Sequence, residues 1–99
     1  MSAKHDHSEA LRELARVLAA LGKSAEVRDT LYALLTPRER ENLALRWRLV
    51  CLLEQGMTQR AIAQALGVSL CKITRGSREL KQGPAALHKA IRLAGRKGR

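Results

Sequence analysis

The sequence has very few aromatic residues: none of its 99 residues is Phe, and there is one Tyr (Tyr32) and one Trp (Trp47). A core must therefore be built from leucine, alanine, valine and isoleucine. A chain of this length forms one small domain with limited capacity to bury such a core. Only two residues are proline, and a chain rich in Leu and Ala with so little proline is predicted to be all-α. A core this modest is often completed by a partner subunit.

Long apolar runs are also absent from the sequence. None approaches the roughly 18 residues that cross a membrane, and no secretory signal opens the chain. The two cysteines, Cys51 and Cys71, lie far apart and match no CxxC pattern. We interpret them as free thiols in a reducing compartment. The sequence thus predicts a cytoplasmic protein that has no membrane partner.

Acidic side chains are scarce in the second half of the chain. Residues 1–45 carry seven basic and seven acidic side chains, whereas residues 46–99 carry twelve basic and two acidic ones, Glu54 and Glu79. The second half therefore accounts for the whole formal net charge of +10. A solvated helix face does not explain this asymmetry, and a polyanionic partner does.

The basic half contains a pattern typical of a helix-turn-helix over residues 58–80. Thr58 and Ser69 are each predicted to cap a short helix, and Gly67 is predicted to end the first helix in a left-handed conformation. Each cap is flanked by an apolar pair at the spacing of a hydrophobic staple: Met57 with Ile62, and Val68 with Ile73. A plain helical hairpin would use the same aliphatic residues but would not need so basic a second helix.

Double-stranded DNA is the partner that this motif predicts, since a helix-turn-helix places its second helix in the major groove. Polar donors dominate the outward positions of both short helices. The predicted DNA-binding residues are Gln59, Arg60, Ser69, Leu70, Cys71, Lys72, Thr74, Arg78 and Lys81.

Two further helices are predicted near the N-terminus. Residues 1–7 are expected to form a disordered arm, and Ser8 to start a helix that ends at Gly22. Ser24 is expected to cap a second, short helix. The residues of this helix that are expected to face inward are Val27, Leu31 and Leu34.

A third and a sixth helix flank the helix-turn-helix. The third is predicted to start at residues 36–39, where Thr-Pro-Arg-Glu combines a capping box with proline at the first helical position, and to end near Gln55. Gly83-Pro84 should start the sixth helix. Residues 95–99 form a basic tail, expected to be unstructured. The helices together are predicted to make a single all-helical domain over residues 8–94.

No catalytic constellation is visible in the sequence, so we do not predict an enzyme. His88 is a lone histidine with no nucleophile or carboxylate nearby in the sequence, and is expected on the surface. There is no glycine-rich phosphate-binding loop. The short run His5-Asp6-His7 lacks the further ligands of a metal site, so no metal is predicted.

Four short strings carry a resemblance to a known family: LTPRERE (35–41), RWR (46–48), TQR (58–60) and ITRGSRELK (73–81). Over residues 33–87 the chain resembles the Trp repressor family. The resemblance implies a six-helix chain intertwined with a second copy into a homodimer. It also implies that the two recognition helices enter successive major grooves of a palindromic operator, with L-tryptophan as the corepressor that sets their spacing.

The resemblance also assigns a ligand pocket between the subunits. Arg46 and Arg75 would sandwich an indole between their guanidinium planes, a stacking role that Lys cannot fill. Arg75, helped by Thr36, would hold the ligand carboxylate. The backbone carbonyls of Ala33 and Leu35 would accept hydrogen bonds from its ammonium group.

Gly76 and Glu79 complete the implied ligand-binding set. Gly76 lacks a side chain where a flat ring would lie against the recognition helix. Glu79 departs from the family, whose pattern has a serine at this position that helps to hold the ligand ammonium; its carboxylate stands four residues after Arg75, so the two can pair. A second departure is the span from Arg48 to Thr58, which is one residue shorter than in the family.

The sequence therefore predicts a dimeric repressor that binds operator DNA when loaded with L-tryptophan. One alternative is a DNA-binding regulator of the same fold that does not respond to tryptophan. Another is a helix-turn-helix interaction module of a transposase or sigma-like assembly, which a monomeric state would favour.

Overall fold

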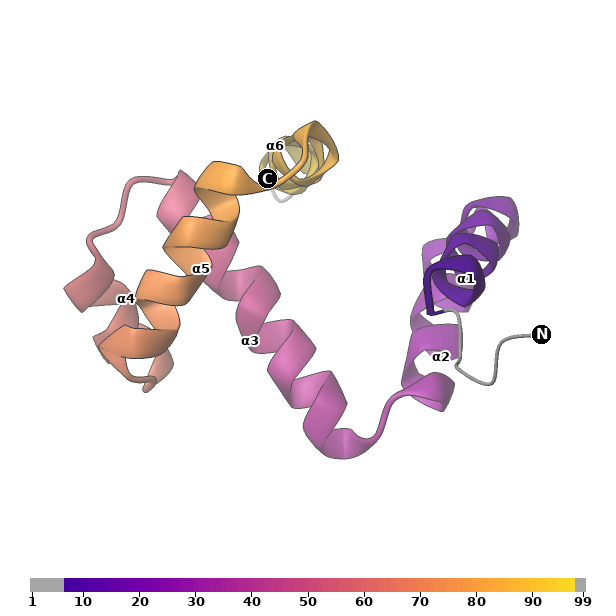
Figure 1. The fold of residues 1–99 in the computed structure, drawn as a ribbon, viewed down its shortest axis with the longest axis horizontal. Coiled ribbons are helices and arrows are strands. Elements are labelled where there is room, and N and C mark those ends of the chain that lie inside the picture. The colour runs from indigo at the N-terminus through magenta and orange to yellow at the C-terminus, as the bar shows by residue number, and fades with distance from the viewer. Residues whose placement is uncertain (1–6, 98–99) are drawn as a thin grey trace. The chain divides into compact units, whose positions relative to one another are not determined.

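A computed structural model describes residues 7–97 of the chain, and these residues form six α-helices and no strand. The helices are α1 (His7–Leu21), α2 (Ser24–Leu34), α3 (Pro37–Glu54), α4 (Gln59–Leu66), α5 (Leu70–Gln82) and α6 (Ala85–Lys97) (Figure 1). The prediction of an all-α, six-helix chain is therefore confirmed. The chain divides into two compact units at residue 40, which are described separately below. The single domain predicted over residues 8–94 stays a prediction.

The first unit, from residue 7 to residue 40, contains the paired helices α1 and α2. Gly22 joins them with a φ of +74°, a left-handed conformation that glycine adopts at no steric cost. Neither helix has a fully buried residue. Leu34, which was predicted to face inward, is 59% exposed, so that prediction is wrong for the chain by itself.

The starts of α1 and α2 each differ by one residue from the sequence prediction. The arm was predicted over residues 1–7, but helix α1 already includes His7, so that prediction is wrong for His7; residues 1–6 lie outside the described residues. Lys23, not Ser24, is the N-cap of α2, because the Lys23 carbonyl already accepts the bond from the backbone N–H of Val27 at 3.0 Å. The predicted Ser24 cap is therefore wrong.

The start of α3 is the capping box that the sequence predicted. The backbone N–H of Glu39 donates to the Thr36 hydroxyl oxygen at 3.1 Å, and the backbone N–H of Thr36 donates to the Glu39 carboxylate at 2.9 Å. Arg40 then donates two hydrogen bonds, of 3.2 and 3.0 Å, to the carbonyl oxygen of Tyr32. Its guanidinium also lies 4.7 Å from the centroid of the Tyr32 ring. These contacts fix the turn between α2 and α3.

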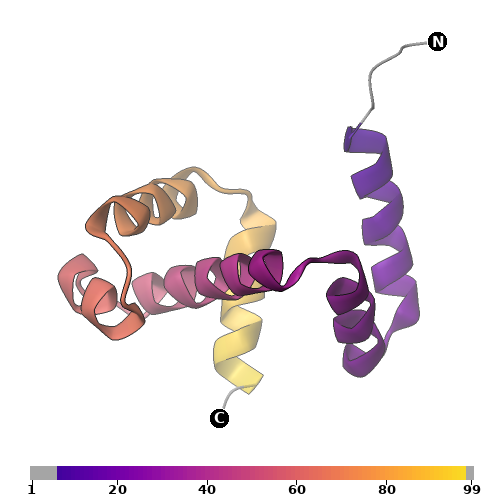
Figure 2. The same ribbon diagram turned by 90° about the horizontal axis from the view of Figure 1, so that it is seen from below.

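The core of the second unit, residues 41–97, joins α3 to the helix-turn-helix. Leu49 of α3, Ile62 of α4 and Ile73 of α5 form one cluster, in which both isoleucines are 0% exposed. Met57 and Val68, the outer members of the two predicted staples, pack against this cluster. Figures 1 and 2 show α4 and α5 lying against the C-terminal half of α3. Helix α5 is therefore held through its buried face.

The caps and the turn of the helix-turn-helix follow the prediction. The Thr58 hydroxyl accepts from the backbone N–H of Ala61 at 3.1 Å, and the Ser69 hydroxyl accepts from that of Lys72 at 3.4 Å. Gly67 ends α4 with φ +68° and ψ +34°, in the left-handed region. The predicted helix-turn-helix over residues 58–80 thus has the expected local geometry.

The last helix begins at Ala85, directly after the Gly83-Pro84 pair that was predicted to start it, and Ile91 of this helix is buried. Helix α6 continues through Lys97, so the expectation of an unstructured tail from residue 95 is wrong for residues 95–97; residues 98–99 lie outside the described part. No helix of residues 7–97 combines the length and apolarity needed to cross a membrane.

Candidate nucleic-acid interface and ligand pocket

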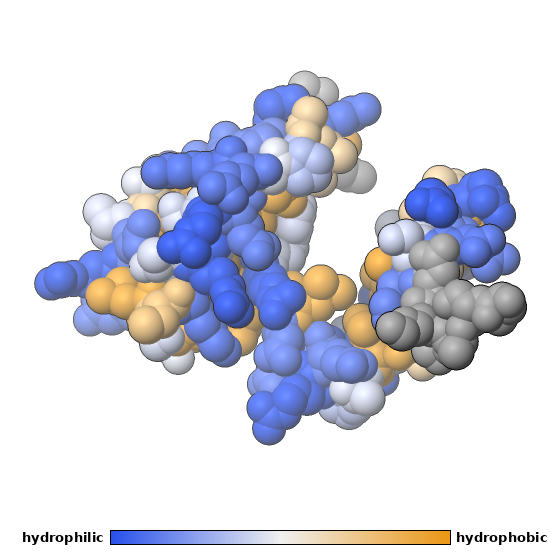
Figure 3. Space-filling view, in the orientation of Figure 1, coloured by the Kyte–Doolittle hydropathy of each residue, from blue (hydrophilic) through white to orange (hydrophobic). Residues whose placement is uncertain are grey.

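Helix α5 buries one side and exposes a polar, basic side. Its 13 residues include four basic side chains and one acidic one, Glu79. Ile73 anchors the helix in the core, and Figure 3 shows a hydrophilic surface over α5. The predicted DNA-binding residues of the turn and α5 that are exposed are Ser69, Leu70, Cys71, Lys72, Thr74, Arg78 and Lys81. The structure thus brings these predicted residues to the surface of one short helix and its cap.

The two helices of the motif are tied together on this surface. The Thr74 hydroxyl donates to the side-chain carbonyl oxygen of Gln59 at 3.3 Å, so a residue of α5 contacts the first residue of α4. Gln59 is half-buried, whereas its neighbour Arg60 is exposed. Because the bond uses the carbonyl oxygen of Gln59, the amide NH₂ group is left to donate elsewhere. Gln59 and Thr74 are therefore held in position by each other before any partner binds.

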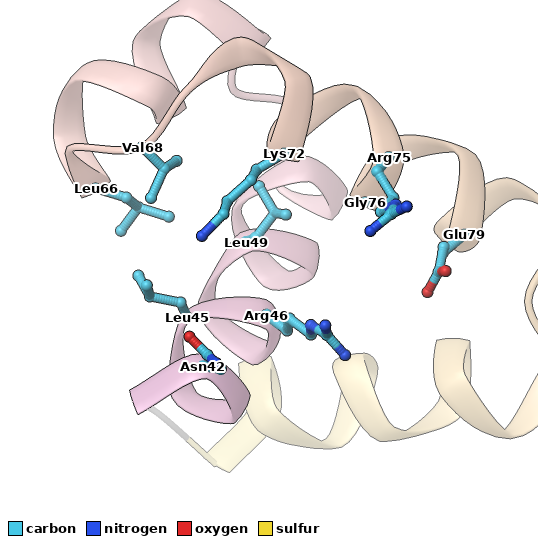
Figure 4. Close-up of a pocket in the computed structure, with 10 residues that line it drawn as sticks. All are labelled: Asn42, Leu45, Arg46, Leu49, Leu66, Val68, Lys72, Arg75, Gly76 and Glu79. Atoms are coloured by element: carbon cyan, nitrogen blue, oxygen red, sulfur yellow. The ribbon is translucent and has the colours of Figure 1, made fainter. Parts of the chain in front are cut away.

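A pocket lies between α3 and the helix-turn-helix (Figure 4). Its volume is about 230 Å³, below the ~300–1,000 Å³ typical of sites for drug-sized ligands, which suits a molecule of amino-acid size. The lining residues are Asn42, Leu45, Arg46, Leu49, Leu66, Val68, Lys72, Arg75, Gly76 and Glu79. Helices α3 and α5 thus supply the polar and charged side chains together with two leucines, and Leu66 of α4 and Val68 of the following turn supply an apolar end.

Four of the seven predicted ligand residues meet at this pocket: Arg46, Arg75, Gly76 and Glu79. The other three, Ala33, Leu35 and Thr36, belong to the unit of residues 7–40 and are not among its lining residues. Within one chain, the structure therefore brings together the α3 and α5 part of the predicted ligand set.

The pocket contains more positive than negative charge. Arg46, Lys72 and Arg75 line it together with one carboxylate, that of Glu79. Within residues 7–97 none of these four side chains makes a hydrogen bond or an ion pair, including Arg75 and Glu79, which stand four residues apart on one helix. Three donors and one acceptor are thus free to engage a ligand that carries both signs of charge.

Gly76 has a packing role in this chain. A Cβ built at position 76 would overlap Cδ2 of Leu49 and lie 3.1 Å from its Cγ. Leu49 is itself only 7% exposed and packs in the core cluster, so a side chain at position 76 would require Leu49 to shift. The absent side chain therefore allows α5 to approach α3 closely. The interpretation of Gly76 as room for a ligand ring stays a prediction.

The two cysteines differ in their surroundings. Cys51 on α3 is half-buried, and this burial raises the pKa of its thiol, against a smaller opposing effect of the Arg48 charge. Cys71, on the outer side of α5, is exposed. Only Cys71 therefore offers an accessible thiol on the predicted DNA-binding surface.

The sequence interpretation missed six lining residues of the pocket. Lys72 was assigned to DNA alone, and the others not assigned to a ligand were Asn42, Leu45, Leu49, Leu66 and Val68. Helical spacing would have found most of them. Positions 42, 45, 46 and 49 on α3, and 72, 75, 76 and 79 on α5, each repeat the i, i+3, i+4, i+7 pattern of one helix face. Starting from Arg46 and Arg75, this pattern identifies both walls.

Other reactive residues do not gather into a site in the described part of the chain. Residues 7–97 contain no group of three or more His, Cys, Asp and Glu side chains that could hold a metal ion. The run of His5, Asp6 and His7 falls largely outside the described residues. His88, expected on the surface, is half-buried on α6.

Comparison with known proteins identifies similar chains. A family model described as Trp repressor protein matches residues 9–94. A Trp operon repressor homolog of Pasteurella multocida (strain Pm70) is 42% identical over 73 residues, which are 73% of this chain and 69% of the relative. Homologs with the same name from Chlamydia caviae and Vibrio cholerae are 49% and 55% identical over 61 and 49 residues. The Chlamydia caviae alignment covers 60% of this chain and 60% of the relative, and the Vibrio cholerae alignment covers 48% of each. This chain therefore matches about half to two thirds of the length of these relatives.

Proposed function

The chain belongs to the Trp repressor family, and on that premise we propose that it is a transcriptional repressor which binds a palindromic DNA operator as a dimer and takes L-tryptophan as corepressor. Relatives named Trp operon repressor homolog support the repressor role. The proposed place of action is the cytoplasm of a bacterium. The family match favours this function over a transposase or sigma-like module.

The observation that carries the DNA part of the proposal is the exposed basic face of α5. Arg78 and Lys81 project from a helix that is anchored by the fully buried Ile73, and Lys72 is exposed at the first turn of the same helix. A rigid basic helix of this kind suits phosphate contacts along a groove and base contacts from its N-terminal residues. In the proposed dimer two such helices bind half-sites about one DNA turn apart.

The observation that carries the ligand part is the pocket of unpaired charges. Arg46 and Arg75 supply guanidinium planes for stacking on an indole, and Glu79 supplies an acceptor for the ligand ammonium. We propose that Ala33, Leu35 and Thr36 of the second subunit close the open side of the pocket in the dimer. The proposed pocket would then couple ligand binding to the orientation of α5.

Calorimetric titration with L-tryptophan tests the ligand proposal and the role of Glu79. We expect wild-type protein to bind L-tryptophan, and Glu79→Gln to bind it about tenfold or more weakly, because a hydrogen bond to a charged group is worth roughly 1.5–3 kcal/mol. An Arg75–Glu79 ion pair on the helix is worth only about 0.3–0.5 kcal/mol. The Glu79 carboxylate should therefore bind the ligand ammonium in preference to Arg75.

Indole-3-propionate is the matched control ligand, since it keeps the indole and carboxylate but has no ammonium. Its affinity should change much less in Glu79→Gln than that of tryptophan. Equal losses for the two ligands would mean that Glu79 acts by holding Arg75 and not by meeting the ammonium. No heat with any of the twenty amino acids would leave the regulator that does not respond to tryptophan as the better proposal.

Alkylation of the two cysteines tests whether α5 meets DNA. Cys71 should react with iodoacetamide faster than Cys51, which is half-buried and whose raised pKa disfavours the reactive thiolate. Saturating duplex DNA should slow the reaction of Cys71 several-fold and leave that of Cys51 unchanged. Mass spectrometry of the alkylated peptides measures both rates in one sample. Protection of neither cysteine would place the DNA elsewhere on the protein.

A further inference from the structure

Lys72 lies at the overlap of two surfaces. It is an exposed residue of the first turn of α5, the part of a recognition helix that meets DNA, and it also lines the pocket. Figure 4 shows its side chain extending from α5 toward the end of the pocket where Leu66 and Val68 lie, whereas Arg46 points toward the end with Arg75 and Glu79. Of the nine residues assigned above to DNA, it is the only one that lines this pocket.

The surroundings of Lys72 divide the pocket into a cationic part and an anionic end. Lys72 stands one turn before Arg75 on α5, and Glu79 stands one turn after Arg75 on the same face. The two ends of this row therefore differ in charge: an ammonium at the first turn of the helix and a carboxylate at residue 79. The positive end of the α5 dipole also lies at the first turn. A ligand with one anionic group finds its best partners between Lys72 and Arg75.

The Lys72 ammonium is free to serve either surface. It makes no hydrogen bond or ion pair with any residue of 7–97, and it stands on a flexible four-carbon stem. An ammonium is a compact point charge that can pair with a carboxylate in the pocket or with a phosphate outside it. It cannot fully do both at once, because it is a single point charge.

We propose that Lys72 holds the anionic group of the pocket ligand, so that loading the pocket withdraws this lysine from the DNA phosphates. The proposal rests on the function proposed above. Lys72 then favours a carboxylate-bearing ligand and opposes part of the gain in DNA affinity that the ligand brings. Ligand binding would thus change both which residues contact the DNA and how many contacts they make.

The salt dependence of DNA binding measures this exchange directly. Each phosphate contact contributes about −0.9 to the slope of log affinity against log salt concentration. With a duplex that the wild-type protein has enriched from a random pool, we expect Lys72→Met to reduce the magnitude of the slope by about 0.9 per subunit without tryptophan. With saturating L-tryptophan the same variant should have almost the wild-type slope.

Lys81→Met is the matched control, because Lys81 is an exposed lysine on the same helix that does not line the pocket. Its effect on the slope should be the same with and without tryptophan. An equal loss for Lys72→Met in both states would overturn the inference alone, leaving Lys72 as a simple phosphate contact. A wild-type protein that binds the duplex but gives no calorimetric signal with tryptophan would overturn the corepressor proposal and the inference together.

Ligand binding without DNA provides the second measurement. Lys72→Met should weaken binding of L-tryptophan and of indole-3-propionate about tenfold or more, since both carry a carboxylate. Binding of tryptamine, which has the ammonium but no carboxylate, should not be weakened. An equal loss for all three ligands would show that Lys72 only shapes the pocket, and would overturn the inference.

Discussion

L-Tryptophan is expected to raise the affinity of the protein for operator DNA by roughly 5- to 150-fold, the usual range for coupling between two sites. The physical reason is that Arg75 and Gly76, which line the pocket, belong to the same helix as Arg78 and Lys81. A ligand held between α3 and α5 therefore constrains the element that meets the DNA. By linkage, operator DNA should raise the affinity for tryptophan by the same factor.

Fluorescence anisotropy of a labelled duplex, with and without saturating tryptophan, measures the gain in DNA affinity. Calorimetric titration with tryptophan, with and without the duplex, measures the gain in tryptophan affinity. Arg46→Ala is the informative variant, because Arg46 lines the pocket from α3 and is not among the residues assigned to DNA. It should lose the tryptophan response and keep the DNA affinity of the unloaded protein. Operator affinity that is identical with and without tryptophan in wild-type protein would contradict the corepressor role.

Local signals in the sequence were sufficient to predict most of the helix boundaries. Thr58, Ser69 and the Thr36–Glu39 box satisfy free backbone N–H groups with their own side chains, and Gly22 and Gly67 take left-handed conformations. These effects act within a few residues, so they can be predicted without knowing the fold. The Ser24 cap failed because Lys23 takes the extended N-cap conformation and Ser24 is already the first residue of the helix.

Properties that depend on contacts between helices were harder to predict. Leu34 stands seven residues after Val27 on one face of α2, yet it is exposed, because helical spacing defines a face and does not say what covers it. Gly76 was interpreted through a ligand, whereas Leu49, 27 positions earlier, occupies the space beside it. Lys72 was assigned to DNA alone, although it shares one helix face with Arg75, Gly76 and Glu79; that this face lines a pocket with α3 is seen only in the folded chain.

The largest expected loss of stability is that of Ile73→Ala. Ile73 is fully buried and joins α5 to Ile62 and Leu49, so its truncation removes apolar contacts and leaves a cavity at the centre of the cluster. Such changes cost about 2–5 kcal/mol. Few residues of the described chain are buried at all, and domains of this size are stable by only about 5–15 kcal/mol. Urea unfolding followed by circular dichroism, at one fixed protein concentration, measures the difference.

Leu70→Ala is the matched control for Ile73→Ala, because it truncates an aliphatic side chain of the same helix that is 46% exposed. Its free energy of unfolding should change by no more than about 0.5–1 kcal/mol. The two variants should also differ in their effect on DNA binding, measured at a temperature where both remain folded. Leu70→Ala should alter which duplexes are preferred, because Leu70 is an exposed apolar residue at the start of α5. Ile73→Ala should weaken binding to all duplexes alike. A small loss for Ile73→Ala would mean that α5 is held by contacts other than this cluster, and the rigid basic helix on which the DNA proposal depends would have to be anchored elsewhere.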